Sequence, residues 1–168
     1  MRSTYQSVVD EVKNLNGIEE AIALAIEREI EARDFYLSKA AVMDRPKFKE
    51  LYEYLANEEV KHLGYLERYR DKNELPVTIA KVPSGQSFTP EFDIGRTKGG
   101  EITLGDVGIL VAALRHERKS EDFYSEVAKR VDDESLKNFF EMLASFERGH
   151  YELIDQLLEE VTRFRMQT

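Results

Sequence analysis

Apolar residues recur every three or four positions along four stretches of the chain, which is the spacing that places them on one face of a helix. The first of these stretches carries good helix formers and contains no proline or glycine. The pattern therefore predicts an all-α protein with four long helices. Their expected bounds are about residues 17–41, 45–73, 104–131 and 133–163.

Residues suited to capping precede each predicted helix. Asn16 with Glu19 is expected to form the N-cap and capping box of the first helix. Asp44 is expected to cap the second helix, ahead of a proline in the first turn. Thr103 and Asp133 are the expected caps of the third and fourth helices.

Residues 74–103 separate the second and third helices. This segment contains three prolines and four glycines, so it cannot continue a helix and reads as an extended crossover. The first 15 residues are ambiguous between a short helix and a loose arm. We expect residues 16–168 to form one domain, since a chain of 168 residues is too short to favour two independent cores.

An internal repeat relates the two halves of the chain. A shift of 88 positions aligns residues 25–40 with 113–128 and, without a gap, residues 49–62 with 137–150. Short breaks within each half make each pair of helices an antiparallel hairpin. Two helical hairpins joined by a long crossover predict an antiparallel four-helix bundle with the ferritin-like connection.

Polar residues interrupt the apolar face of every predicted helix. Each helix places one glutamate in mid-face, and the second and fourth add a histidine three positions later, on the same side of the helix. Four buried carboxylates need neutralising, either by protons that raise their pKa values or by two divalent cations. The alternative is a set of internal salt links or a degenerate site. The six candidate ligands are Glu29, Glu59, His62, Glu117, Glu147 and His150.

These residues resemble those of the rubrerythrin and ferritin-like di-iron carboxylate superfamily. The resemblance covers roughly residues 16–163 apart from the crossover. It implies that Glu59 and Glu147 bridge two irons, with manganese as the other candidate metal, and that Glu29 and Glu117 are terminal ligands. Each histidine would bind one iron. The motifs that carry the resemblance are Glu29 with Tyr36, Glu59-x-x-His62, Glu117 with Tyr124 and Glu147-x-x-His150.

The resemblance also implies roles for residues around the ligands. Tyr36 and Tyr124 resemble tyrosines that hydrogen-bond ligand carboxylates. Rubrerythrins usually carry a further carboxylate three residues after the glutamate of the third helix, where this chain has Ser120. Glu121 lies close enough along the chain to be a substitute.

The function implied is a non-haem di-iron oxidoreductase that reduces hydrogen peroxide or dioxygen. The chain contains no cysteine, so it lacks the cysteine-rich iron domain that delivers electrons in rubrerythrins, and a separate donor protein is expected. The alternatives are a ferroxidase or iron-handling protein of ferritin type, and a non-redox structural metal site.

Composition and charge exclude two classes of binding partner. The chain has 33 acidic and 24 basic residues and a formal net charge of −9, without a basic cluster of the kind that binds nucleic acid. No apolar run reaches the length of a membrane span, and the N-terminal segment lacks the apolar core of a signal peptide. We therefore expect a cytoplasmic protein that binds neither nucleic acid nor membranes. We also expect the protein to be a homodimer.

Overall fold

The computed structural model describes residues 3–76 and 103–166, with side chains to residue 163. Every regular element in this part of the chain is a helix, as predicted. Most of the expected crossover, 74–103, lies outside the described residues. The helices are α1 (Thr4–Lys13), α2 (Ile18–Val42), α3 (Pro46–Lys72), α4 (Leu104–Arg130) and α5 (Glu134–Met166).

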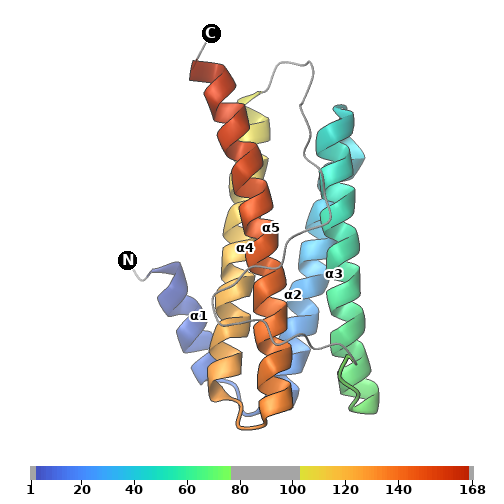
Figure 1. The fold of residues 1–168 in the computed structure, drawn as a ribbon, viewed down its shortest axis with the longest axis vertical. Helices are drawn as coiled ribbons and strands as arrows, with labels where there is room; N and C mark the ends of the chain where they lie inside the picture. The colour runs from blue at the N-terminus through green and yellow to red at the C-terminus, as the bar shows by residue number, and fades with distance from the viewer. Residues whose placement is uncertain (1–2, 77–102, 167–168) are drawn as a thin grey trace.

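The four long helices form two antiparallel hairpins that lie side by side (Figure 1). Helices pack most extensively within a hairpin, α2 on α3 and α4 on α5. The end of α3 and the start of α4 lie at opposite ends of the bundle (Figure 1), so the chain between them must connect the two ends. The predicted fold of two hairpins in an antiparallel bundle is confirmed.

Capping residues explain where α4 and α5 begin. Thr103 accepts a hydrogen bond from the Asp106 backbone N–H, and the Asp106 carboxylate accepts one from the Thr103 N–H at 2.7 Å, which completes a capping box. Asp133 accepts from the Leu136 N–H at 2.8 Å. Both predicted caps are confirmed, and α5 continues to Met166, past its predicted end at about 163.

The predicted caps of α2 and α3 are wrong. The N-cap of α2 is Gly17, at φ 136°, a backbone conformation that glycine adopts without a steric cost. The turn at Gly17 brings the Glu20 carboxylate back to the Asn16 N–H, so Asn16 donates at 2.9 Å instead of capping. The N-cap of α3 is Arg45 rather than Asp44, because Pro46 occupies the first helical position.

The short helix α1 packs against α4, beside the hairpins. The Tyr5 hydroxyl donates to Glu126 of α4 at 2.7 Å. Arg28 of α2 pairs with Glu11 of α1 at 2.5 Å, and its guanidinium lies 4.6 Å from the centre of the Phe123 ring. The N-terminal segment is therefore a helix that is held to the bundle by both apolar packing and charge.

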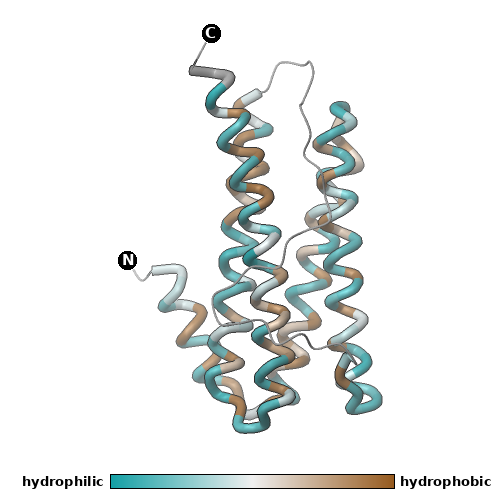
Figure 2. Tube along the Cα trace, viewed as in Figure 1, coloured by the Kyte–Doolittle hydropathy of each residue, from teal (hydrophilic) through white to brown (hydrophobic). Residues whose placement is uncertain are grey.

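Hydrophobic and hydrophilic positions alternate along each long helix (Figure 2). The buried apolar residues form two clusters. One gathers around Phe123, Phe139 and Phe140, and the other around Leu51, Leu55 and Leu110. Along every long helix, the predicted ligand positions fall between the residues of one cluster and those of the other. Among the described residues, no helix combines the length and the apolar character that a membrane span requires.

Candidate metal centre

The six predicted ligands meet in the bundle interior. Each is at most 2% exposed. Their side chains form two overlapping groups of four, in which one ligand atom per residue lies within 4.8 Å of all the others. Glu59 and Glu147 belong to both groups. Glu29 and His62 complete one group, and the other is completed by Glu117 and His150.

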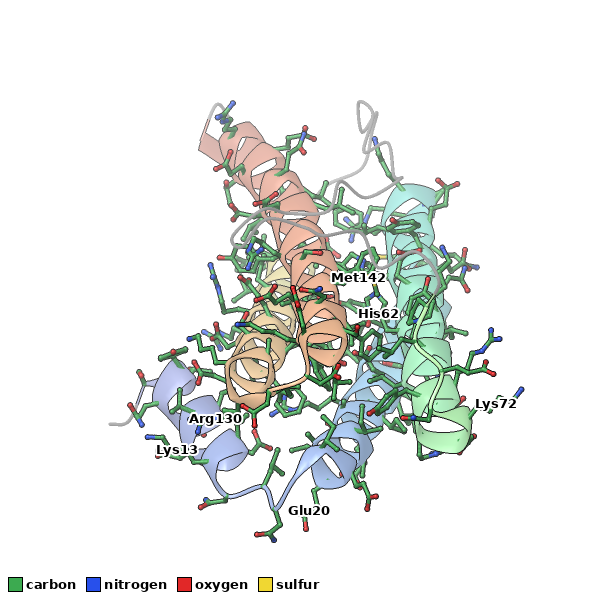
Figure 3. The ribbon with its side chains drawn as sticks, turned by 60° about the horizontal axis from the view of Figure 1, so that its bottom comes forward. Lys13, Glu20, His62, Lys72, Arg130 and Met142 are labelled. Atoms are coloured by element: carbon green, nitrogen blue, oxygen red, sulfur yellow. The ribbon has the colours of Figure 1, made fainter. Side chains whose placement is uncertain are left out.

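Both histidines direct Nδ1 toward the carboxylates. His62 Nδ1 lies 3.0 Å from Glu147 and 3.2 Å from Glu59. His150 Nδ1 lies 3.5 Å from Glu117 and 3.6 Å from Glu59. The two imidazole rings are stacked, with centroids 5.6 Å apart and planes 13° from parallel. His62 lies between the two hairpins (Figure 3), so the rings meet at the boundary between the repeats.

Several polar atoms of the cluster are buried without a hydrogen-bond partner among the described residues. They include both carboxylate oxygens of Glu59, one oxygen each of Glu117 and Glu147, and the Nδ1 atoms of His62 and His150. Buried polar atoms are nearly always satisfied, and so many unsatisfied ones at a single point fit a site that could hold a cation. Oxygen and imidazole nitrogen donors without thiolate suit iron or manganese, so the residues fit the predicted metals.

The four carboxyl groups of the cluster fall into two pairs, one with raised and one with lowered pKa values. Burial, with Glu59 and Glu147 nearby, raises the pKa values of Glu29 and Glu117 well above the usual range. Burial would also raise the pKa of Glu59, but the two neighbouring imidazoles outweigh it and lower this pKa to about 2. For Glu147, burial is outweighed by the neighbouring Glu117 and the two imidazoles, and the pKa falls well below the usual range.

Burial and the neighbouring carboxylates act on the two histidines in opposite directions. Burial alone would lower their pKa values. The facing carboxylates, Glu147 for His62 and Glu117 for His150, outweigh burial and raise both pKa values well above the usual range. Two divalent cations would match the charge of four ionised carboxylates and would displace the protons that these groups otherwise hold.

Two buried tyrosines donate hydrogen bonds to Glu117 and Glu29, one to each. The Tyr36 hydroxyl donates to the Glu117 carboxylate, and the Tyr124 hydroxyl donates to Glu29. Each bond therefore runs from one hairpin to the other. The predicted hydrogen bonds from tyrosines to candidate ligands are confirmed.

Glu58 is a part of the site that sequence reasoning missed. It precedes Glu59 on α3, and its carboxylate Oε2 lies 3.9 Å from His150 Nε2, the nitrogen on the far side of the ring from the cluster. Lys61 pairs with its other oxygen at 2.6 Å. The neighbouring His150 imidazole is the largest cause that lowers the pKa of Glu58 to about 2. Glu58, His62 and His150 also form a third group of potential metal ligands.

Glu121 lies outside all three groups of potential ligands. Its carboxylate lies 2.8 Å from Arg148 Nε and 3.6 Å from an Arg118 nitrogen. Ser120 is buried at the position where rubrerythrins usually carry a further carboxylate. The chain therefore offers no seventh carboxylate to the cluster from this part of α4.

Comparison with known proteins supports the resemblance predicted from the sequence. The family model described as Rubrerythrin matches residues 108–165, which include Glu117, Glu147 and His150. Residues 108–165 are therefore similar to rubrerythrins. The match covers most of the second hairpin, and the first hairpin carries the same ligand pattern through the internal repeat.

A solved structure described as a hypothetical protein from Pyrococcus furiosus is similar to this chain. The two share 26% sequence identity and a TM-score of 0.68. The similarity covers 91% of this chain and 96% of that chain, so it extends across both hairpins. No curated protein matches the sequence.

Proposed function

We propose that the protein holds two iron ions between its hairpins and reduces hydrogen peroxide or dioxygen there. The observation that carries the proposal is the pair of overlapping four-residue groups that share Glu59 and Glu147. The rubrerythrin match favours iron over manganese. Iron, when bound, supplies the redox chemistry, and the protein supplies the binding geometry.

Each ligand has a distinct task in this proposal. Glu29 and His62 would hold one ion, Glu117 and His150 would hold the other, and the two glutamates that belong to both groups could contact both ions. The tyrosine hydroxyls fix the orientation of the terminal carboxylates, as outer hydrogen-bond partners do in other metal sites. The apolar clusters at either side of the centre exclude bulk water from it.

Electrons must reach the centre from outside the chain. The sequence contains no cysteine, so it carries no thiolate-bound iron centre of its own. A separate donor protein is therefore part of the proposal. We expect the working form to be a cytoplasmic homodimer, and light scattering measures its assembly state directly.

The activity is tested with protein loaded with iron under anaerobic conditions and supplied with a reductant. We expect consumption of peroxide or dioxygen in the unmodified protein and its loss in Glu59→Ala and Glu147→Ala. Glu53→Ala is the matched control, because Glu53 lies on the exposed face of α3. Equal turnover in all four proteins would contradict the proposal. A large cage that accumulates ferric iron would instead indicate iron storage of the ferritin type.

A further inference from the structure

The two halves of the centre differ at one position beside the histidines. The shift of 88 that relates His62 to His150 also relates Glu58 to Phe146. In the structure each of these residues lies against the histidine of the opposite hairpin. Glu58 places a carboxylate oxygen 3.9 Å from His150 Nε2, and the Phe146 ring centre lies 5.2 Å from that of His62.

The two imidazoles therefore have different surroundings behind the cluster. Both turn Nδ1 to the shared carboxylates. Behind His150, the nearby carboxylate favours the tautomer with a proton on Nε2 and leaves the Nδ1 lone pair for a metal. Behind His62, Nε2 is buried and has no hydrogen-bond partner among the described residues. A carboxylate behind a ligand histidine fixes the ring and strengthens its nitrogen as a donor.

The ion pair with Lys61 does not account for the position of Glu58. The Lys61 side chain is 62% exposed, whereas that of Glu58 is 12% exposed. An ion pair with so exposed a lysine contributes little to stability, while burying most of a carboxylate has a cost. The contact with His150 accounts for the buried position of Glu58.

We propose that Glu58 is a positioning residue that makes the two metal positions unequal. The position held by Glu117 and His150 binds a divalent cation more tightly than the position held by Glu29 and His62, and it fills first. The inference rests on the proposed metal centre, and it goes further by assigning an order to its two positions.

Anaerobic titration of metal-free protein with Co(II) tests the order, with calorimetry for affinity and visible absorption for the ligand field of each ion. We expect two binding steps, with the first about 10–100-fold tighter than the second. Glu58→Gln keeps the side-chain shape and removes its charge. It should weaken the first step about 10–100-fold, shift the absorption of the first ion and leave the second step unchanged. Phe146→Leu, at the related position, should leave the first step unchanged.

Variants that disable one position assign each step. Glu29→Gln should retain the tight step, and adding Glu58→Gln should weaken it. Glu117→Gln should retain only the weak step, which Glu58→Gln should leave unchanged. Equal affinities in these two single variants would overturn the inferred order of binding but not the proposed metal centre. Equal weakening of both steps by Glu58→Gln would do the same. Three ions per chain, with one lost in Glu58→Gln, would make Glu58 a ligand and also overturn it. Failure to bind any Co(II) would contradict the proposed metal centre itself.

Discussion

The first hairpin, α2 with α3, and the second, α4 with α5, agree closely where they face the centre and differ one layer further out. Both supply a terminal glutamate, a glutamate–histidine pair and a tyrosine that donates to the other hairpin. Behind the tyrosines, Tyr36 stacks on Tyr52 and Tyr124 stacks on Phe140, with ring centroids 6.3 Å apart in each pair. The centre thus constrains the residues that touch it, and those behind them are freer to differ.

The largest expected effect comes from the glutamates that the two halves share. Because Glu59 and Glu147 each belong to both groups of ligands, replacing either with alanine should prevent both ions from binding. Glu29→Ala or Glu117→Ala should remove only one. Metal content per chain, from elemental analysis, measures the difference. A loss of one ion in all four variants would show that the bridging assignment is wrong.

Metal binding should also join the two hairpins. Each ion would contact residues from both hairpins, so binding should favour the folded bundle over the unfolded chain. A free metal concentration about a thousand times Kd adds about 4 kcal/mol to the free energy of unfolding. For a protein of this size that raises Tm by roughly 10 °C. Thermal unfolding with metal and with a chelator measures the shift, and coincident curves would contradict the prediction.

Metal affinity should rise with pH. In the metal-free protein the pKa values of His62, His150, Glu29 and Glu117 are raised well above their usual ranges, which favours their protonated forms. A bound ion must displace these protons, so each proton released raises the affinity about tenfold per pH unit.

The stability of the metal-free protein should depend on pH in the opposite direction, and fall as the pH rises. The interactions of the protonated histidines stabilise it below their unfolded pKa, and this contribution is lost as the pH rises through their raised folded pKa values. The difference in Tm between loaded and metal-free protein should therefore increase with pH. A pH titration of Tm for both forms checks the sign, and a difference that shrinks toward high pH would refute it.

The smallest expected effect concerns Tyr52. Its hydroxyl is fully buried without a hydrogen-bond partner among the described residues, and burial raises its pKa above the usual value. Tyr52→Phe would give the first hairpin the residue that the second has at Phe140. Because it removes an unsatisfied polar group, we expect it to raise the free energy of unfolding by about 1 kcal/mol. Denaturant unfolding measures this, and a loss of stability would indicate that the hydroxyl has a partner.

The sequence predicted much of the fold because one periodicity sets both the helices and their buried faces. Glu29 and Glu117 stand out since each interrupts an apolar face, and the repeat shows the interruption twice. Glu58 gives no such signal. It lies about 100° around the helix from Glu59, away from the predicted face, and only the approach of α5 gives it a contact. Long-range contacts of this kind do not follow from the pattern of a single helix.

The N-cap of α2 was predicted wrongly for another reason, which concerns backbone conformation and not long-range contacts. Asn16 is a common capping residue, but the choice between it and Gly17 depends on a positive φ that propensity alone does not reveal. The apolar pattern of the helices also could not predict which glutamate each tyrosine would contact. Tyr36 and Glu29 share a face of α2, yet Tyr36 donates to Glu117 because that carboxylate comes from the facing hairpin.

A single chain that carries both hairpins has a freedom that two identical hairpins would lack. In a symmetric pair of identical subunits, any residue beside one histidine must also stand beside the other. Covalent linkage of the two repeats removes that constraint, so glutamate can occupy position 58 while phenylalanine occupies position 146. One binding pattern, repeated within the chain, can thus serve two halves that are not identical.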